Sequence, residues 1–119
     1  MKRTLVVGAS PNPHRYSFKA TKRLRVHGHE VVAFGIRKGF IDEVEISLQW
    51  PRHAEFHSVT LYMNPERQAV HHQAIIDLRP KRVIFNPGTE NDYFQEKLDR
   101  AGIEWVEACT LVMLSIGNY

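Results

Sequence analysis

The feature that most constrains the fold is the opening of the chain, where a short apolar run passes directly into small residues. Residues Thr4–Val7 form this run, and Gly8, Ala9 and Ser10 follow it ahead of a basic helical pattern. A strand that ends in small residues before a helix lets an anion approach the backbone, where amide N–H groups and the helix dipole can bind it. The opening therefore predicts a nucleotide-binding turn in an α/β domain.

This turn is shorter than a full dinucleotide-binding motif. The complete motif has three glycines in the pattern G-x-G-x-x-G, whereas this chain has only Gly8, followed by Pro11 and Pro13. An ordinary strand-to-helix connection without a ligand is therefore the alternative interpretation of the same residues.

Apolar strand-like runs alternate with helical patterns along the whole chain. Strands separated by single helices imply right-handed crossovers and a parallel sheet that is covered on both faces. We therefore predict an α/β fold, with residues 1–119 forming a single doubly wound, Rossmann-like domain around a mainly parallel five-stranded sheet. The expected strands are Thr4–Val7, Glu30–Phe34, Ser58–Met63, Arg82–Asn86 and Ile103–Glu107, with a possible edge strand around Val44–Leu48. The expected helices are Tyr16–His27, Pro65–Leu78, Asp92–Ala101 and a short one from about Thr110.

Turn and capping residues support these boundaries. Gly28 and Gly102 follow predicted helices at the position where a left-handed residue is favoured. Asn64 precedes Pro65, which places a capping side chain before a proline at the first helical position. Residues 89–92 have the spacing of a capping box, which predicts that Thr89 caps the third helix.

Composition excludes some functional classes and leaves others open. No apolar run approaches the roughly 20 residues that a membrane-spanning helix needs. A single cysteine cannot form an internal disulfide, so we expect a cytoplasmic protein. The net charge of +3 suits a small anion as well as nucleic acid. The first predicted helix carries four cations, Lys19, Lys22, Arg23 and Arg25. We interpret them as the solvated face of this helix and expect no nucleic-acid partner.

The end of the second predicted strand discriminates between nucleotides. An NAD-binding domain has an acidic residue there, which binds the ribose hydroxyls. This chain has Arg37 and Lys38 instead. Two cations suit an adenosine whose ribose carries a phosphate, as in coenzyme A or NADP. The alternative is that both are solvated loop charges.

Cys109 and the histidines offer weaker signals. Cys109 follows the fifth predicted strand and opens the last helix, where the dipole favours a thiolate, but no local base accompanies it. We interpret it as a packed thiol. His71 and His72 are adjacent on a helix and face different directions, and His27 and His29 lie at a turn without a carboxylate or thiol partner. We therefore expect neither a catalytic residue nor a metal site.

Several segments together resemble the small stand-alone bacterial CoA-binding proteins, whose Rossmann-like domain also occurs in the α subunit of succinyl-CoA synthetase. The similarity covers nearly the whole chain, in the expected order. The segments that carry it are Val6–Pro13, Arg15-Tyr16-Ser17, Gly28–Val32, Leu61–Pro65, Phe85–Asn91 and Ala101–Thr110.

The resemblance implies coenzyme A bound across the carboxyl ends of the strands. One departure concerns the second strand, where many members have an Asn-Pro-Lys/Arg turn and this chain has Phe34 through Lys38, so either cation could bind the 3′-phosphate. The predicted function is non-catalytic binding of CoA or an acyl-CoA, in a monomer or a homodimer. The alternatives are a small NADP-dependent oxidoreductase and a ligand-free structural or partner-binding domain. The predicted binding residues are Gly8, Ala9, Ser10, Arg15, Tyr16, Ser17, Gly35, Arg37, Lys38, Asn64, Pro65 and Gly88.

Overall fold

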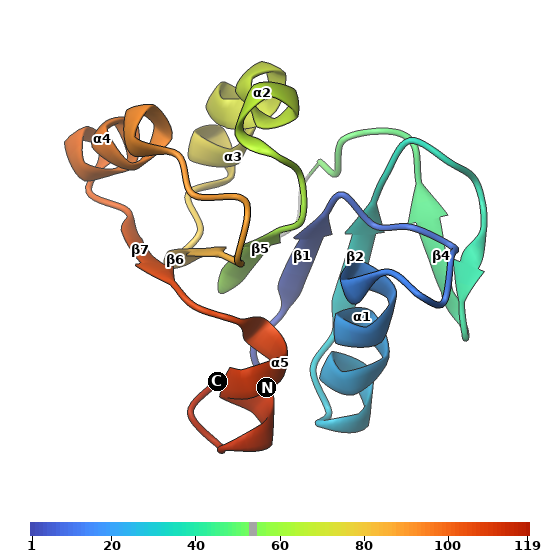
Figure 1. Cartoon of the computed structure of the whole chain (residues 1–119). Coiled ribbons are helices and arrows are strands. Elements are labelled where there is room, and N and C mark those ends of the chain that lie inside the picture. The colour runs from blue at the N-terminus through green and yellow to red at the C-terminus, as the bar shows by residue number, and fades with distance from the viewer. Residues whose placement is uncertain (53–54) are drawn as a thin grey trace.

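A computed structural model describes residues 1–52 and 55–119 of the chain. Within these ranges one sheet of seven strands runs in the order β3-β4-β2-β1-β5-β6-β7 (Figure 1). The strands are β1 (Thr4–Val7), β2 (Val31–Phe34), β3 (Phe40–Ile41), β4 (Val44–Ser47), β5 (Ser58–Leu61), β6 (Arg82–Phe85) and β7 (Glu104–Glu107). The helices are α1 (Tyr16–Val26), α2 (Pro65–Gln68), the 3₁₀ turn η1 (Ala69–His71), α3 (His72–Leu78), α4 (Asp92–Ala101) and α5 (Thr110–Ser115).

The predicted α/β class and doubly wound order are confirmed, but the strand number is wrong. All neighbours from β4 to β7 pair in parallel, and the chain reverses its direction of travel across the sheet between β1 and β5. The possible edge strand is β4. Beyond it lies β3, which pairs antiparallel with β4 through a tight turn at Asp42, a left-handed residue with φ of 52°. A two-residue strand has too little periodicity to be recognised in a sequence.

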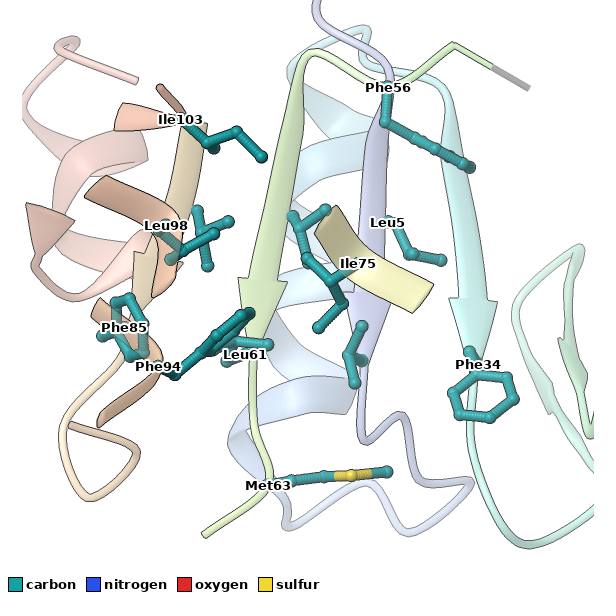
Figure 2. Packing of buried hydrophobic residues seen from close by; sticks show 13 residues of the cluster. Leu5, Phe34, Phe56, Leu61, Met63, Ile75, Phe85, Phe94, Leu98 and Ile103 are labelled. Carbon is teal, nitrogen blue, oxygen red and sulfur yellow. The ribbon is translucent and has the colours of Figure 1, made fainter. Parts of the chain in front are cut away.

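Two apolar clusters cover the two faces of the sheet. The side chains of β1 and β5 are entirely buried, as expected for central strands of a covered parallel sheet. One cluster joins Leu5 and Val59 to Ile75 of α3 and Leu98 of α4 (Figure 2). The other lies on the opposite face and joins Val6 to α1 and α5. Alternating residues of one strand therefore anchor both helical layers.

The predicted caps are present with one exception. Gly28 and Gly102 have the left-handed φ values of 83° and 72°, and the Asn64 side chain accepts a hydrogen bond from the Arg67 amide. The expected Thr89 cap is wrong. Asn91 caps α4 by accepting from the Phe94 amide, whereas the Thr89 hydroxyl turns back to donate to the carbonyl of Asn86.

The single helix expected over residues 65–78 is interrupted by η1. This turn ends at His71, the first of two adjacent histidines that pack in different places. The ring of His71 stacks on Trp50 with centroids 5.4 Å apart, and that of His72 stacks on Phe94 at 3.9 Å. A 3₁₀ turn advances successive side chains by a larger angle than an α-helix does. The interruption of the helix by η1 therefore accompanies tertiary contacts of His71 and His72 that the local sequence does not predict.

Candidate functional site

The reversal in strand order places the loop after β1 against the loop after β5. Gly8 has a φ of 96°, and a Cβ built on it would lie 2.9 Å from the carbonyl carbon of Tyr62 and 3.0 Å from Cγ of Met63. Only glycine avoids both the backbone strain and this overlap. In an open parallel sheet, a ligand binds in the crevice at this reversal, beyond the carboxyl ends of the strands.

The loop after β2 is fitted just as closely to the loop after β1. A Cβ on Gly35 would lie 2.2 Å from the carbonyl oxygen of Ala9, and one on Gly39 would lie 2.6 Å from Cβ of Pro11. The amides of Gly8 and Ala9 both donate to the carbonyl oxygen of Phe34, at 2.9 Å each. The predicted residues Gly8, Ala9 and Gly35 are therefore brought together by backbone packing.

These bonds change which amides can face an anion. Gly8 and Ala9 use their N–H groups within the fold, so the free donors lie further along the chain. Arg15 caps α1 without a side-chain hydrogen bond, and within the described ranges the amides of Tyr16, Ser17 and Phe18 donate to no protein acceptor. They are the first three amides of an eleven-residue helix, where the dipole also favours a negative charge.

The connection that leads to this helix is internally bonded. The Ser10 hydroxyl accepts from the amide of Asn12, and the Asn12 side chain accepts from that of His14. The Arg15 amide donates to the carbonyl of Asn12. The segment is therefore held in one conformation, with Arg15 and Tyr16 exposed at its end.

Three predicted cations surround this edge with exposed side chains. Arg15 precedes α1, and Arg37 and Lys38 lie in the loop after β2. Among the described residues, none of these three cations forms an ion pair. The four ion pairs present use Arg3, Lys22, Arg25 and Arg100. Their charge is therefore available to an anionic ligand.

The remaining predicted residues lie further from β1. Asn64 and Pro65 follow β5, and the Asn64 carboxamide oxygen is used to cap α2. Gly88 follows β6, on the far side of β5 from β1, and its amide donates to the Glu90 carboxylate at 2.8 Å. Among the predicted binding residues, Gly88 therefore follows the strand that lies furthest from β1 in the sheet.

Gln68 is a positioning residue that sequence analysis missed. Its buried side chain donates to the carbonyls of Met63 and Thr89, at 2.9 and 2.7 Å, and so joins the loops after β5 and β6. The His72 ring lies beside its carboxamide oxygen at 3.4 Å. Because glutamine is usually exposed on a helix, no local signal marks this one as buried.

A second buried network holds the start of α5 to the sheet. The Asn86 side chain donates to the Thr60 hydroxyl at 2.7 Å and to the carbonyl of Leu61 at 2.9 Å, and it accepts from the Thr110 amide at 2.9 Å. The half-buried Cys109 immediately precedes this helix, as expected. Asn86 thus fixes the position of the cysteine relative to the strand ends.

An aromatic cluster lies beside the same edge and was also missed. Phe34, the last residue of β2, packs edge-on against Trp50 and His71, with centroids 4.7 and 5.1 Å apart. Burial lowers the pKa of His71. In Figure 2, Phe34 and Met63 lie at the carboxyl ends of their strands, opposite Phe56 and Ile103.

The described residues contain no cluster of three histidine, cysteine or acidic side chains that could hold a metal ion. None of the helices in this part of the chain has the length and apolar character needed to cross a membrane.

Comparison with solved structures places the fold among small α/β proteins. The chain matches an uncharacterized protein with a TM-score of 0.97 and 47% identity, over 100% of this chain and 98% of the other. A Thermus thermophilus protein matches with a TM-score of 0.85 and 20% identity over 99% of this chain and 91% of its own. A hypothetical protein from Pyrococcus horikoshii matches with a TM-score of 0.88 and 24% identity over 97% and 82%. No functionally curated protein matches the chain significantly.

The sequence also matches a family model, that of the CoA binding domain, over residues 2–115. This match includes every strand and every residue predicted to bind the ligand. The chain therefore belongs to the CoA-binding domain family.

Proposed function

We propose that this protein binds coenzyme A, free or acylated, across the carboxyl ends of β1, β2 and β5. The observation that carries the proposal is the close fit of the loops after these strands, which leaves free amides at the start of α1 between unpaired cations. Family membership supports the same ligand.

The pyrophosphate is assigned to the start of α1. The amides of Tyr16, Ser17 and Phe18 can donate to its oxygens, and the exposed Arg15 supplies a positive charge beside them. Helix N-termini bind phosphates because the free N–H groups and the dipole act on the same anion.

The adenosine end is assigned to the loop after β2. Arg37 or Lys38 binds the ribose 3′-phosphate, and the preceding side chain of Ile36, 64% exposed, offers an apolar contact to the adenine. The pantetheine arm then passes Asn64 and Pro65 after β5, which puts the thiol on the side of the sheet that carries β6 and β7.

The roles of the polar groups at this edge support binding without catalysis. Asn64 caps a helix, Asn86 holds α5, and Glu90 bonds the Gly88 amide. Burial raises the pKa of the Tyr62 phenol, so it remains protonated and is not a general base. These groups stabilise the loops that surround the ligand.

Calorimetric titration with CoA, dephospho-CoA and NADP tests the proposal, with native mass spectrometry of the purified protein as a second measurement. We expect one CoA per chain, bound about tenfold or more tightly than either other nucleotide, because each lacks a contact that CoA makes. Tighter binding of NADP, with hydride transfer to an added acceptor, would favour the oxidoreductase. A melting temperature that none of the three raises would favour a structural or partner-binding domain.

A further inference from the structure

A basic hollow lies at the amino ends of the strands, on the side of the molecule opposite the proposed CoA site. It has a volume of about 550 Å³ and opens at the amino ends of β1, β5 and β6. Figure 1 shows the two chain ends together on this side, beside α5. Its titratable lining comprises Lys2, His57, Arg79, Lys81, Arg82 and Glu104.

The basic hollow has a surplus of positive charge. Four permanent cations line it and Glu104 is the one acidic lining residue, while no ion pair to an acidic side chain involves these cations in the described ranges. Lys2 Nζ and an Arg82 nitrogen donate to the main-chain oxygen of Tyr119, at 2.6 and 2.8 Å. Even a full negative charge on that oxygen leaves more cations than anions.

Hydrogen bonds hold the side chains of three of the four cations, Lys2, Arg79 and Arg82. The Arg82 guanidinium donates to the Ser58 hydroxyl at 2.7 Å and lies 4.5 Å from the Tyr119 ring centroid. An Arg79 nitrogen donates to the carbonyl of Ala101 at 3.1 Å. The amides of Lys81 and Arg82 both donate to the carbonyl of His57, which fixes the turn between α3 and β6.

His57 lines the basic hollow and lies close to its cations. Burial lowers the pKa of His57, and the charges of Arg82, Lys2 and Lys81 lower it further. Burial and nearby positive charges, including Lys2 and Arg82, also lower the pKa of His29, whose Nδ1 accepts from the Lys2 amide. Both rings are therefore neutral near pH 7, and a bound anion would favour their protonation.

We propose that the basic hollow is a second anion site, which binds the phosphate group of a small phosphorylated molecule. Lysine and arginine side chains that line one hollow suit a tetrahedral dianion with several acceptor oxygens. The site lies at the amino ends of the strands, whereas the CoA loops follow their carboxyl ends, and it does not depend on the proposed function.

Inorganic phosphate is the probe, followed residue by residue in ¹⁵N-labelled protein at low ionic strength. We expect saturable shifts of the amides of His57, Lys81 and Gly102. Lys81→Ala should weaken this binding about threefold to fivefold, because exposed ionic contacts are modest. Its side chain makes no hydrogen bond among the described residues, so the fold should be unaffected. Lys97→Ala on α4 removes the same charge outside the hollow and should leave the affinity unchanged.

A second measurement follows the His57 ring directly. Replacing chloride by sulfate at equal ionic strength should raise its pKa, because a dianion in the hollow offsets the charges of Lys2, Lys81 and Arg82. Shifts confined to the Gly8, Tyr16 and Ile36 amides would place phosphate at the CoA site alone and overturn the proposal. Equal weakening by Lys97→Ala, or no saturation, would mean diffuse surface charge and overturn it too. If the protein did not bind CoA, the amide shifts and the His57 pKa would still test the basic hollow.

Discussion

The backbone of Gly8 lies so close to that of Tyr62 that a Cβ on Gly8 would fall 2.9 Å from the Tyr62 carbonyl carbon. This contact joins the loops on the two sides of the reversal in strand order. The same glycine has a left-handed φ of 96°, so two separate constraints exclude a side chain there. The structure offers a control that separates them, because Gly28 has a φ of 83° and open space around its Cβ position.

Gly8→Ala should destabilise the protein and weaken CoA binding, whereas Gly28→Ala should only destabilise it. Both changes cost about 1–2 kcal/mol through the left-handed backbone. Gly8→Ala should cost about 1–3 kcal/mol more, because the Cβ must displace the Tyr62 backbone. Urea unfolding and calorimetric CoA titration of both variants measure the two effects. Wild-type affinity in a folded Gly8→Ala protein would place the ligand elsewhere.

The pair Arg37 and Lys38 should distinguish CoA from dephospho-CoA, which differ only in the 3′-phosphate. If either cation binds that phosphate, the double change to alanine should weaken CoA about tenfold or more and dephospho-CoA much less. The selective loss should shrink as salt rises, since the loop is exposed. The double variant Lys97→Ala/Arg100→Ala removes two charges from α4 as a control. Equal losses for both ligands would mean that Arg37 and Lys38 act by shaping the loop or through long-range charge.

Much of the fold could be predicted because its signals are local. The central parallel strands β2, β1, β5 and β6 are short, mainly apolar runs, and Gly28, Gly102 and Asn64 have the backbone or capping roles expected from their neighbours. The strand β3 was missed because two residues show too little periodicity, and the η1 turn was missed because it depends on contacts with residues distant in the sequence. One needs β4 beside it, and the other accompanies the packing of His71 on Trp50 and of His72 on Phe94.

The candidate site was less predictable because its geometry depends on neighbouring strands. The sequence indicates a small-residue turn at Gly8, but the bonding of the Gly8 and Ala9 amides to Phe34 depends on how β1 and β2 pair. The role of Gln68 depends on two loops, because its side chain bonds to Met63 and also to Thr89, which lies 21 residues beyond Gln68 in the sequence. The binding roles of the predicted residues stay predictions until they are measured.

Asn86 should be among the most sensitive polar residues in the chain. Asn86→Ala leaves the Thr110 amide without its acceptor and the carbonyl of Leu61 without one of its donors. Each buried group that loses its partner costs about 1–3 kcal/mol. We therefore expect the free energy of unfolding of Asn86→Ala to fall by about 3 kcal/mol. Asn91→Ala, which removes the α4 cap and two longer hydrogen bonds to Pro65 and Gln68 at 3.4 and 3.3 Å, should cost about 1 kcal/mol. Similar losses for the two variants, measured in urea, would mean that the network around Asn86 contributes little.

Cys109 should be dispensable for binding if it is only a packed thiol. Cys109→Ser should change CoA affinity by no more than about twofold, as for other substitutions that touch no essential contact. Its place at the start of α5, beyond the end of β7, also allows a mixed disulfide with CoA, in which the Cys109 thiolate attacks added CoA disulfide and releases one CoA thiolate. Mass spectrometry of the wild-type protein without reductant tests this directly. An adduct that is absent from Cys109→Ser would show that the thiol is reactive.

His72 should make the protein less stable in mild acid. Its ring is only 2% exposed and stacks on Phe94, and burial, with smaller effects of Lys97 and His71, lowers its pKa to about 4. In the unfolded chain the pKa returns to about 6.5, so between these values the unfolded state binds a proton that the folded state does not. Stability from this group is therefore complete above about pH 6.5 and falls by up to about 1.4 kcal/mol per pH unit as the pH drops towards 4. His72→Phe keeps a stacking ring and removes the titration, so urea unfolding from pH 7 to 4.5 should show a smaller decline in the variant. Parallel curves for the two proteins would assign the acid sensitivity to other groups, such as His29, His57 and His71, whose pKa values are also lowered.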